Sequence, residues 1–204
     1  MIESWINKKY LEKSTIKRIR NNFLEAKPYP HFVLPDFLKK GMILKLRKEI
    51  LKEQFKRQDK DLFSFYNTQE LMFSKNKIIN DFFNLLSSNE FLSLMENLTN
   101  EKRIKNIDMH AHLYKQGDYL LFHDDVVEGR KIAYILYMSN GFAAKDGGRL
   151  ELYDTKNPLK PVKSIIPGFN SFLCFKVSGR SLHAVEEVKS SKERITLGGW
   201  FYGH

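Results

Sequence analysis

Three side chains in the second half of the chain have the types and spacing needed to bind a metal ion. His123 and Asp125 lie two positions apart in F-H-D-D-V, directly after an apolar run that predicts a strand over residues 118–124. Because alternate residues of a strand share a face, we expect both side chains to point into one cavity and Asp124 to point away. His183, in the strand-like segment S-L-H-A-V, is the natural third ligand.

Two histidines and one carboxylate form the facial triad of non-heme Fe(II) oxygenases, which leaves coordination positions open for a co-substrate and O2. Arg194 follows in R-I-T-L-G-G-W-F-Y, with Thr196 two positions later on the same predicted strand face. A guanidinium stays charged at working pH and binds a carboxylate through two parallel hydrogen bonds. The order of these residues therefore predicts an iron site beside a clamp for a dicarboxylate co-substrate.

The elements that would position this site change character along the chain. Apolar residues at helical spacing predict helices over residues 2–24, 35–57 and 69–99, with an extended entry that runs from residue 27 and ends at Pro35. From residue 104 the period changes toward two, which predicts strands over 107–114, 118–124, 131–139, 149–153, 162–166, 171–177, 181–188 and 193–201.

Eight such strands suit a double-stranded β-helix, or jelly roll, whose interior can hold a small-molecule site. We therefore expect an α+β fold in which the N-terminal helices pack on one sheet of the jelly roll. Residues 1–204 would form a single domain, with 1–103 a mainly helical support region and 104–204 the jelly-roll core.

Composition restricts the class of protein further. The chain has 204 residues, of which 42% are hydrophobic, and no apolar stretch approaches the roughly 20 residues that span a bilayer. Its start carries charges and no continuous apolar segment of a signal peptide. Cys174 is the one cysteine and cannot form an internal disulfide, so a reducing compartment, cytoplasmic or nuclear, is expected.

The positive charge is concentrated at the N-terminal end. The net charge is +10, and residues 1–60 hold 16 Lys or Arg against 7 Asp or Glu. Such a segment could follow nucleic-acid phosphates, for example those of ribosomal RNA. The alternative is a solvated, lysine-rich helix face without a partner.

Several blocks together resemble a known family: L-L-F-H-D-D-V-V-E-G-R-K-I-A-Y-I-L-Y, G-G-R-L-E-L-Y-D, P-V-K-S-I-I-P-G-F-N-S-F-L-C-F-K-V-S, S-L-H-A-V-E-E-V and R-I-T-L-G-G-W-F-Y-G. They resemble the catalytic domain of the eukaryotic ribosomal prolyl hydroxylases. These Fe(II)- and 2-oxoglutarate-dependent dioxygenases modify a proline in the decoding-centre protein of the small ribosomal subunit. The resemblance extends weakly upstream to about residue 27.

The resemblance implies a role for each matching residue. His123, Asp125 and His183 would bind Fe(II), and Arg194 would pair with the far carboxylate of 2-oxoglutarate. Tyr137 matches a tyrosine that hydrogen-bonds that carboxylate, and Tyr114 matches one that contributes to the co-substrate pocket; ordinary core packing is the alternative for both. The implied reaction consumes O2, with ascorbate as reductant, and hydroxylates a prolyl ring carbon of a small-subunit ribosomal protein.

Other classes of function remain to be weighed against this one. A nucleic-acid demethylase of the same superfamily would explain the basic surplus. That group has the pattern R-x-x-x-x-x-R in the last strand, whereas here Trp200 stands six positions after Arg194, in place of the second arginine. A cupin-type metal site could use His110 and His112. A non-enzymatic RNA-binding or ribosome-binding jelly roll would be expected to lose a triad residue, and none is lost.

Larger members of the family carry a second, non-catalytic jelly-roll domain after the G-W-F segment. The present sequence ends at His204, so we expect either a compact single-domain relative or a truncated one.

Overall fold

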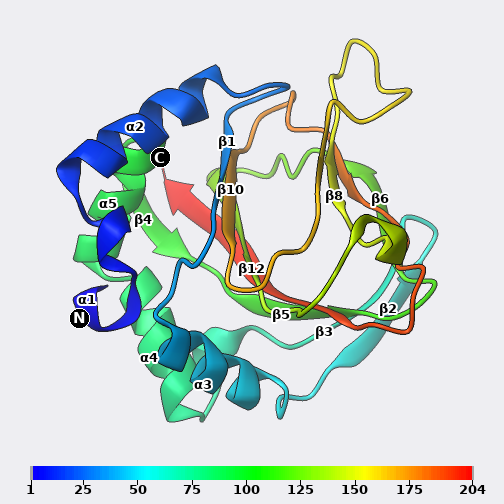
Figure 1. The fold of residues 1–204 in the computed structure, drawn as a ribbon, viewed down its shortest axis with the longest axis horizontal. Coiled ribbons are helices and arrows are strands. Elements are labelled where there is room, and N and C mark those ends of the chain that lie inside the picture. Colours follow the sequence, from blue (N-terminus) through cyan, green and yellow to red (C-terminus); the bar gives the residue numbers. More distant parts are fainter. Residues whose placement is uncertain (1, 204) are drawn as a thin grey trace.

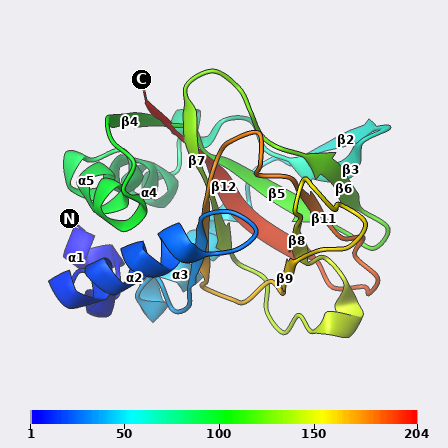
Figure 2. The same cartoon turned by 90° about the horizontal axis from the view of Figure 1, so that it is seen from above.

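The computed structural model describes residues 2–203 and contains a curled antiparallel sheet with helices against one side (Figures 1 and 2). The helices are α1 (Ile2–Trp5), η1 (Lys8–Tyr10), α2 (Lys13–Glu25), α3 (Lys40–Ile50), η2 (Leu71–Phe73), α4 (Lys77–Leu86), α5 (Asn89–Thr99) and η3 (Ala144–Asp146). The strands are β1 (His31–Leu34), β2 (Lys56–Lys60), β3 (Phe63–Asn67), β4 (Ile104–Ile107), β5 (His110–Tyr114), β6 (Tyr119–His123), β7 (Arg130–Tyr137), β8 (Leu150–Leu152), β9 (Lys163–Ile165), β10 (Phe172–Lys176), β11 (His183–Val185) and β12 (Arg194–Gly203).

All strands belong to one sheet with the order β1-β10-β7-β12-β5-β3-β6-β11-β8-β9, and β2 and β4 pair with β3 and β12. The sheet curls so that β6 and β8 lie across from β1 and β10 (Figure 1). The predicted jelly-roll core with helices on one sheet is therefore confirmed.

Strands β5, β7, β10 and β12 have two distinct faces, because successive side chains alternate. Their outer face packs against the helices in one apolar core, to which the strands contribute Ala111, Leu113, Ile132, Tyr134, Leu136, Phe172, Cys174, Ile195, Leu197 and Phe201. Their inner face meets the opposite strands in a second core, which includes Tyr114, Ala133, Tyr137, Leu150, Leu173, Phe175 and Val185.

The helices begin and end where side chains or tertiary contacts satisfy their backbone groups. The Asn76 side chain accepts hydrogen bonds from the backbone at Ile78 and Ile79, and the Ser88 side chain accepts one from Phe91. These two caps divide the helix predicted over residues 69–99 into η2, α4 and α5. The N-terminal helix predicted over 2–24 is likewise interrupted, between α1 and α2.

The predicted start of the helix over residues 35–57 was wrong, since α3 begins only at Lys40. The backbone N–H groups of Phe37 and Leu38 donate instead to the main-chain and side-chain oxygens of Asn170. Those groups are therefore bound to the loop before β10 and cannot enter a helix. The end was also wrong, because Lys56 and Arg57 belong to strand β2.

The β2–β3 hairpin was not predicted, and it joins the two halves of the sheet. β3 pairs with β5 through Tyr66 and Asn67, and with β6 through Phe63 and Ser64. β2 is exposed over nearly its whole length, so its sequence shows no alternation of apolar residues. Strand β1, predicted only as an extended entry, pairs with β10 at one end of the sheet.

Among the described residues, no helix has both the length and the apolar character required to cross a membrane.

Candidate metal centre and co-substrate pocket

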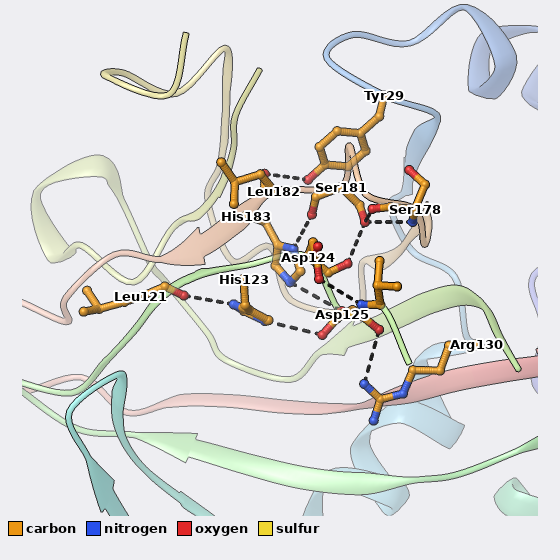
Figure 3. Close-up of polar contacts among 11 residues, drawn as sticks. Tyr29, Leu121, His123, Asp124, Asp125, Arg130, Ser178, Ser181, Leu182 and His183 are labelled. Atoms are coloured by element: carbon orange, nitrogen blue, oxygen red, sulfur yellow. Dashed lines mark hydrogen bonds and ion pairs between the residues drawn. The ribbon is translucent and has the colours of Figure 1, made fainter. Parts of the chain in front are cut away.

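The two histidines meet because their strands are neighbours. β6 and β11 pair antiparallel, and His183 lies directly opposite His123 in the register. The centres of the two imidazole rings are 4.0 Å apart. The pairing of two strands far apart in sequence thus brings both rings to one end of β6 (Figure 3).

Asp125 reaches the same point by a different route from the predicted one. β6 ends at His123, and Asp125 adopts a left-handed backbone conformation with φ of 64°. The loop is held because the Asp124 side chain accepts a hydrogen bond from Val126 and the Asp124 carbonyl accepts one from Ser181. The expected strand alternation over residues 123–125 was therefore wrong, although the carboxylate still faces both histidines.

The three side chains surround one point (Figure 3). The Nε2 atom of His123 lies 3.4 Å from Oδ1 of Asp125, and Nε2 of His183 lies 3.5 Å from Oδ2. One ligand atom from each residue lies within 4.8 Å of the others, and among the described residues this is the only group of three or more potential ligands so arranged. His110 and His112 join no such group, which argues against a cupin-type site.

Hydrogen bonds fix the tautomers of both rings. Nδ1 of His123 contacts the carbonyl of Leu121 at 2.9 Å, and Nδ1 of His183 contacts the carbonyl of Ser181 at 2.7 Å. Because a carbonyl only accepts, each Nδ1 carries the proton and each Nε2 keeps its lone pair. This orientation of the outer ring nitrogen is the usual one for a metal-ligating histidine.

His183 is also kept neutral by its surroundings. Burial, and secondarily the neighbouring His123, lower the pKa of His183 to about 4, against the opposing effect of Asp125. A neutral imidazole is the form that binds a metal.

The metal centre opens into a pocket of about 250 Å³ between the two halves of the sheet. The pocket is lined mainly by apolar and aromatic side chains from both halves, with a few polar groups among them: Phe63, Phe65, His112, Tyr114, Leu120, His123, Asp125, Leu150, Phe175, His183, Val185, Arg194, Thr196 and Trp200. A mostly apolar cavity with a few convergent polar groups is typical of a small-molecule site.

Arg194 is the cation of this pocket and is 1% exposed. Its Nε donates to the carbonyl of Gly148 at 2.8 Å, and its guanidinium carbon lies 4.9 Å and 5.4 Å from the ring centres of Tyr114 and Tyr137. Gly148 has φ of 66°, and an added Cβ would lie 3.2 Å from the Arg194 side chain, so the close approach requires glycine.

Two buried polar atoms in this group have no partner within the described part of the chain: Nη2 of Arg194 and the hydroxyl of Tyr137. An unpaired buried donor is costly, so the pair fits an absent anionic ligand such as a carboxylate. Burial raises the pKa of Tyr137, partly offset by Arg194, and the phenol therefore stays a donor. Thr196 is buried and lines the same pocket.

Two residues beside the pocket were not identified from the sequence. The Arg130 guanidinium stacks 3.4 Å from the ring centre of Trp200, and its Nη1 lies 3.4 Å from the carbonyl of Asp125. Trp200 lines the pocket, and its indole N–H is buried without a partner in the described residues. Side chains alternate along β12, so Trp200, six positions after Arg194, lies on the same face as Arg194. This spacing could have identified Trp200 from the sequence.

Comparisons with known proteins agree with this geometry. Residues 109–202 match the family model of the 2OG-Fe(II) oxygenase superfamily. The chain is 36% identical over 185 residues to prolyl 3-hydroxylase OGFOD1 of Xenopus laevis, covering 88% of this chain and 36% of that protein. It is 32% identical over 209 residues to prolyl 3,4-dihydroxylase OGFOD1 of Ostreococcus tauri, covering 92% of this chain and 40% of that one.

The chain therefore spans less than half the length of these relatives. Among solved structures, a Pseudomonas putida prolyl-4-hydroxylase matches with a TM-score of 0.74 and 16% identity, covering 93% of this chain and 99% of that one. At such low identity the match shows the fold alone. The family match over residues 109–202 and the homology to the OGFOD1 prolyl hydroxylases show that the chain contains a 2OG-Fe(II) oxygenase domain.

Proposed function

We propose that the chain is an Fe(II)- and 2-oxoglutarate-dependent dioxygenase that hydroxylates a prolyl residue of a protein. The observation that carries this proposal is the combination of a converging His123, Asp125 and His183 with a buried, partly unpaired Arg194 in one pocket. The prolyl hydroxylases that share a third of its residues support the choice of substrate amino acid.

In this proposal, His123, Asp125 and His183 hold Fe(II), and the donor set fits because two neutral imidazoles and a carboxylate suit that ion. When bound, iron and 2-oxoglutarate supply the chemistry that activates O2 for hydroxylation. The protein orients the ligands through the carbonyls of Leu121 and Ser181, which hold the two rings.

The co-substrate carboxylate distant from the metal would pair with Arg194 and accept a hydrogen bond from Tyr137. This assignment satisfies the two unpartnered polar atoms together. Tyr114 and Thr196 complete the polar side of the pocket. The apolar walls exclude water, which strengthens these contacts and limits side reactions.

The substrate proline would enter beside Trp200. The Arg130 guanidinium stacks on the Trp200 indole, so the indole presents a fixed apolar surface to a pyrrolidine ring. The indole N–H, which has no partner in the described residues, can donate to a peptide carbonyl. Fixing the peptide on both sides of the proline would determine which ring carbon is hydroxylated.

We further propose that the target is a small-subunit ribosomal protein, that ascorbate serves as reductant, that the protein acts in the cytoplasm or nucleus, and that residues 1–204 form one dioxygenase domain. The similarity to the ribosomal prolyl hydroxylases supports the target, and the basic N-terminal segment offers a means of contact with ribosomal RNA. That contact would offset repulsion between a basic enzyme region and a basic substrate.

Intact-mass spectrometry tests this function directly. The small-subunit ribosomal proteins are incubated with enzyme, Fe(II) and 2-oxoglutarate, with and without ascorbate. We expect one protein to gain one oxygen, mapped to a proline by fragmentation, and no gain without 2-oxoglutarate or with Asp125→Ala. Succinate formation without any modified ribosomal protein would retain the chemistry and reject this target; no 2-oxoglutarate turnover with any prolyl substrate would reject the enzyme.

A further inference from the structure

A second concavity, a groove of about 490 Å³, lies between α2, β1 and β9, away from the metal ligands. Helix α2 lies beside β1 in Figure 1. The groove is lined by residues from η1, α2, β1 and β9, among them Lys9, Thr15, Arg18, Asn22, His31 and Lys163. It shares none of these residues with the metal pocket.

The polar lining of the groove follows from the pattern of α2. Ile19 and Phe23 anchor the helix in the outer-face core, where both are buried. Thr15, Arg18 and Asn22, spaced by three and four residues, form a neighbouring stripe that faces the groove. Arg18 and Asn22 thus present hydrogen-bonding groups to the groove, while the Thr15 hydroxyl donates to Glu12.

The charged side chains that line the groove are cationic. Lys9, Arg18 and Lys163 are exposed, and no ion pair joins these three to a carboxylate of the described chain. Two carboxylates lie at the edge of the groove, because Glu12 accepts a hydrogen bond from Thr15 and Asp36 acts on Tyr10 together with Arg18. His31 and Lys163 both line the groove, from β1 and β9. Burial and the charge of Lys163 lower the pKa of His31, against the opposing hydrogen bond to the carbonyl of Tyr29. Cations from three separate elements therefore converge on the groove.

We propose that this groove binds the phosphate backbone of single-stranded RNA. Several cations along an open groove match a chain of repeated single negative charges, and the arginine fork of Arg18 with the amide of Asn22 suits phosphate oxygens. Ile19 and Phe23 of α2 are buried and Leu24 is the one exposed large apolar residue of this helix, so α2 presents no apolar stripe to a membrane surface. The proposal does not depend on the metal pocket or its chemistry.

RNA in the groove would lie next to a segment that contacts the metal site. Tyr29, two residues before His31, packs 5.9 Å from the ring centre of Phe175 and donates to the carbonyl of Leu182. Phe175 in turn lies 4.6 Å from the ring of His183. A protein bound to the same RNA would thus be held near the pocket.

Fluorescence anisotropy with a fluorescein-labelled oligouridine tests the groove without metal or 2-oxoglutarate. The test variant is Arg18→Glu with Lys163→Glu, and the control is Lys45→Glu with Lys48→Glu, two exposed lysines of α3 that change the net charge equally. We expect the test variant to weaken binding on the order of tenfold or more, and its dependence on salt to fall by roughly 1.4 in the slope of log K against log salt. The control should lose less than about threefold.

Equal losses in the two variants would overturn the proposal, because charge alone would then explain binding. Displacement of the RNA by poly-glutamate as readily as by unlabelled oligouridine would also overturn it, in favour of an acidic peptide. Thermal unfolding checks that both variants fold. If the test pair does not, Lys163→Ala alone is the milder variant, with about a threefold loss expected and no change contradicting the groove.

Discussion

The inner and outer faces of the sheet are built from the same strands and differ in how their buried polar groups are satisfied. On the outer face, the Tyr134 hydroxyl donates to the carbonyl of Asp108, and Cys174 is a buried thiol whose pKa burial raises. On the inner face, His110, Tyr137, Arg194 and Trp200 each have a buried polar atom without a partner in the described chain.

The difference separates the roles of the two faces: the outer face stabilises the fold, and the inner face is arranged to bind a ligand. Unpaired buried polar groups destabilise a protein, so a face that retains several of them is poorly explained by stability. The outer face holds the helices to the sheet through rings such as Phe172 and Phe201. The inner face supplies donors and metal ligands at some cost in stability.

The largest effect should come from removing a proposed metal ligand. Asp125→Ala should reduce succinate formation and peptide hydroxylation to background, because two imidazoles alone do not form the facial triad. Unfolding by urea should change little, since Asp125 lies in a loop after β6. Cys174→Ala on the outer face is the control and should keep turnover. Wild-type turnover in Asp125→Ala would contradict the site.

Truncation on the outer face should have the opposite signature. Phe172 is fully buried and stacks on Phe37 with ring centres 4.3 Å apart. Phe172→Ala should lower the free energy of unfolding by about 3–5 kcal/mol, measured by urea denaturation. Molecules that remain folded should retain the wild-type affinity for 2-oxoglutarate. An unchanged urea midpoint would show that the outer core does not depend on this ring.

Arg194→Ala should mainly weaken the binding of 2-oxoglutarate. We expect its apparent affinity to fall by about 2 kcal/mol or more, because a buried anionic partner would lose its charge-assisted hydrogen bonds. Arg194→Lys keeps the charge without the planar fork and should recover only part of the affinity. Apparent affinities measured by succinate formation check this, and equal values for wild type and Arg194→Ala would exclude the clamp.

The inner face should also make stability depend on pH through His112. Burial, with repulsion from His110 and Arg194, lowers the pKa of His112 from 6.5 to about 3. The unfolded chain therefore takes up the proton first, so this stabilisation is complete above pH 6.5 and is lost as pH falls toward 3. Relative to His112→Asn, the metal-free wild type should lose about 1.4 kcal/mol per pH unit in that window. If the free energies of unfolding of wild type and His112→Asn change with pH in parallel, His112 is not buried as a neutral imidazole.

The smallest expected effect concerns the indole N–H at the pocket. Trp200→Phe keeps an aromatic ring against Arg130 and removes only the donor. We expect the KM for a prolyl peptide to rise about two- to tenfold, the value of one hydrogen bond, while the KM for 2-oxoglutarate stays constant. If instead the two KM values rise together, Trp200 acts on the shape of the pocket as a whole.

Alternation along single strands made much of this arrangement predictable. The eight ranges predicted from residue 104 onward all contain strands, and the segments around His183 and Arg194 carry the apolar pattern of a buried sheet. The helical N-terminal region and its place on one face were predictable for the same reason, because apolar stripes must be covered.

The parts that were missed depend on contacts between distant residues. Asn170 binds the backbone at Phe37 and Leu38, which delays the start of α3, and no local pattern near Pro35 encodes that contact. β2 is polar and exposed and pairs only with β3, so it lacks the alternation that predicts a strand. Asp125 is left-handed in a loop whose Asp124 carbonyl accepts a hydrogen bond from Ser181, a residue of a different segment.

Calorimetric titration of the metal-free protein with Fe(II) under anaerobic conditions, followed by 2-oxoglutarate, tests the inner-face site most directly. We predict one Fe(II) per chain in the wild type, then one 2-oxoglutarate, with the first step lost in Asp125→Ala and the second weakened in Arg194→Ala. Fe(II) binding of equal affinity and stoichiometry in wild type and Asp125→Ala would contradict the account.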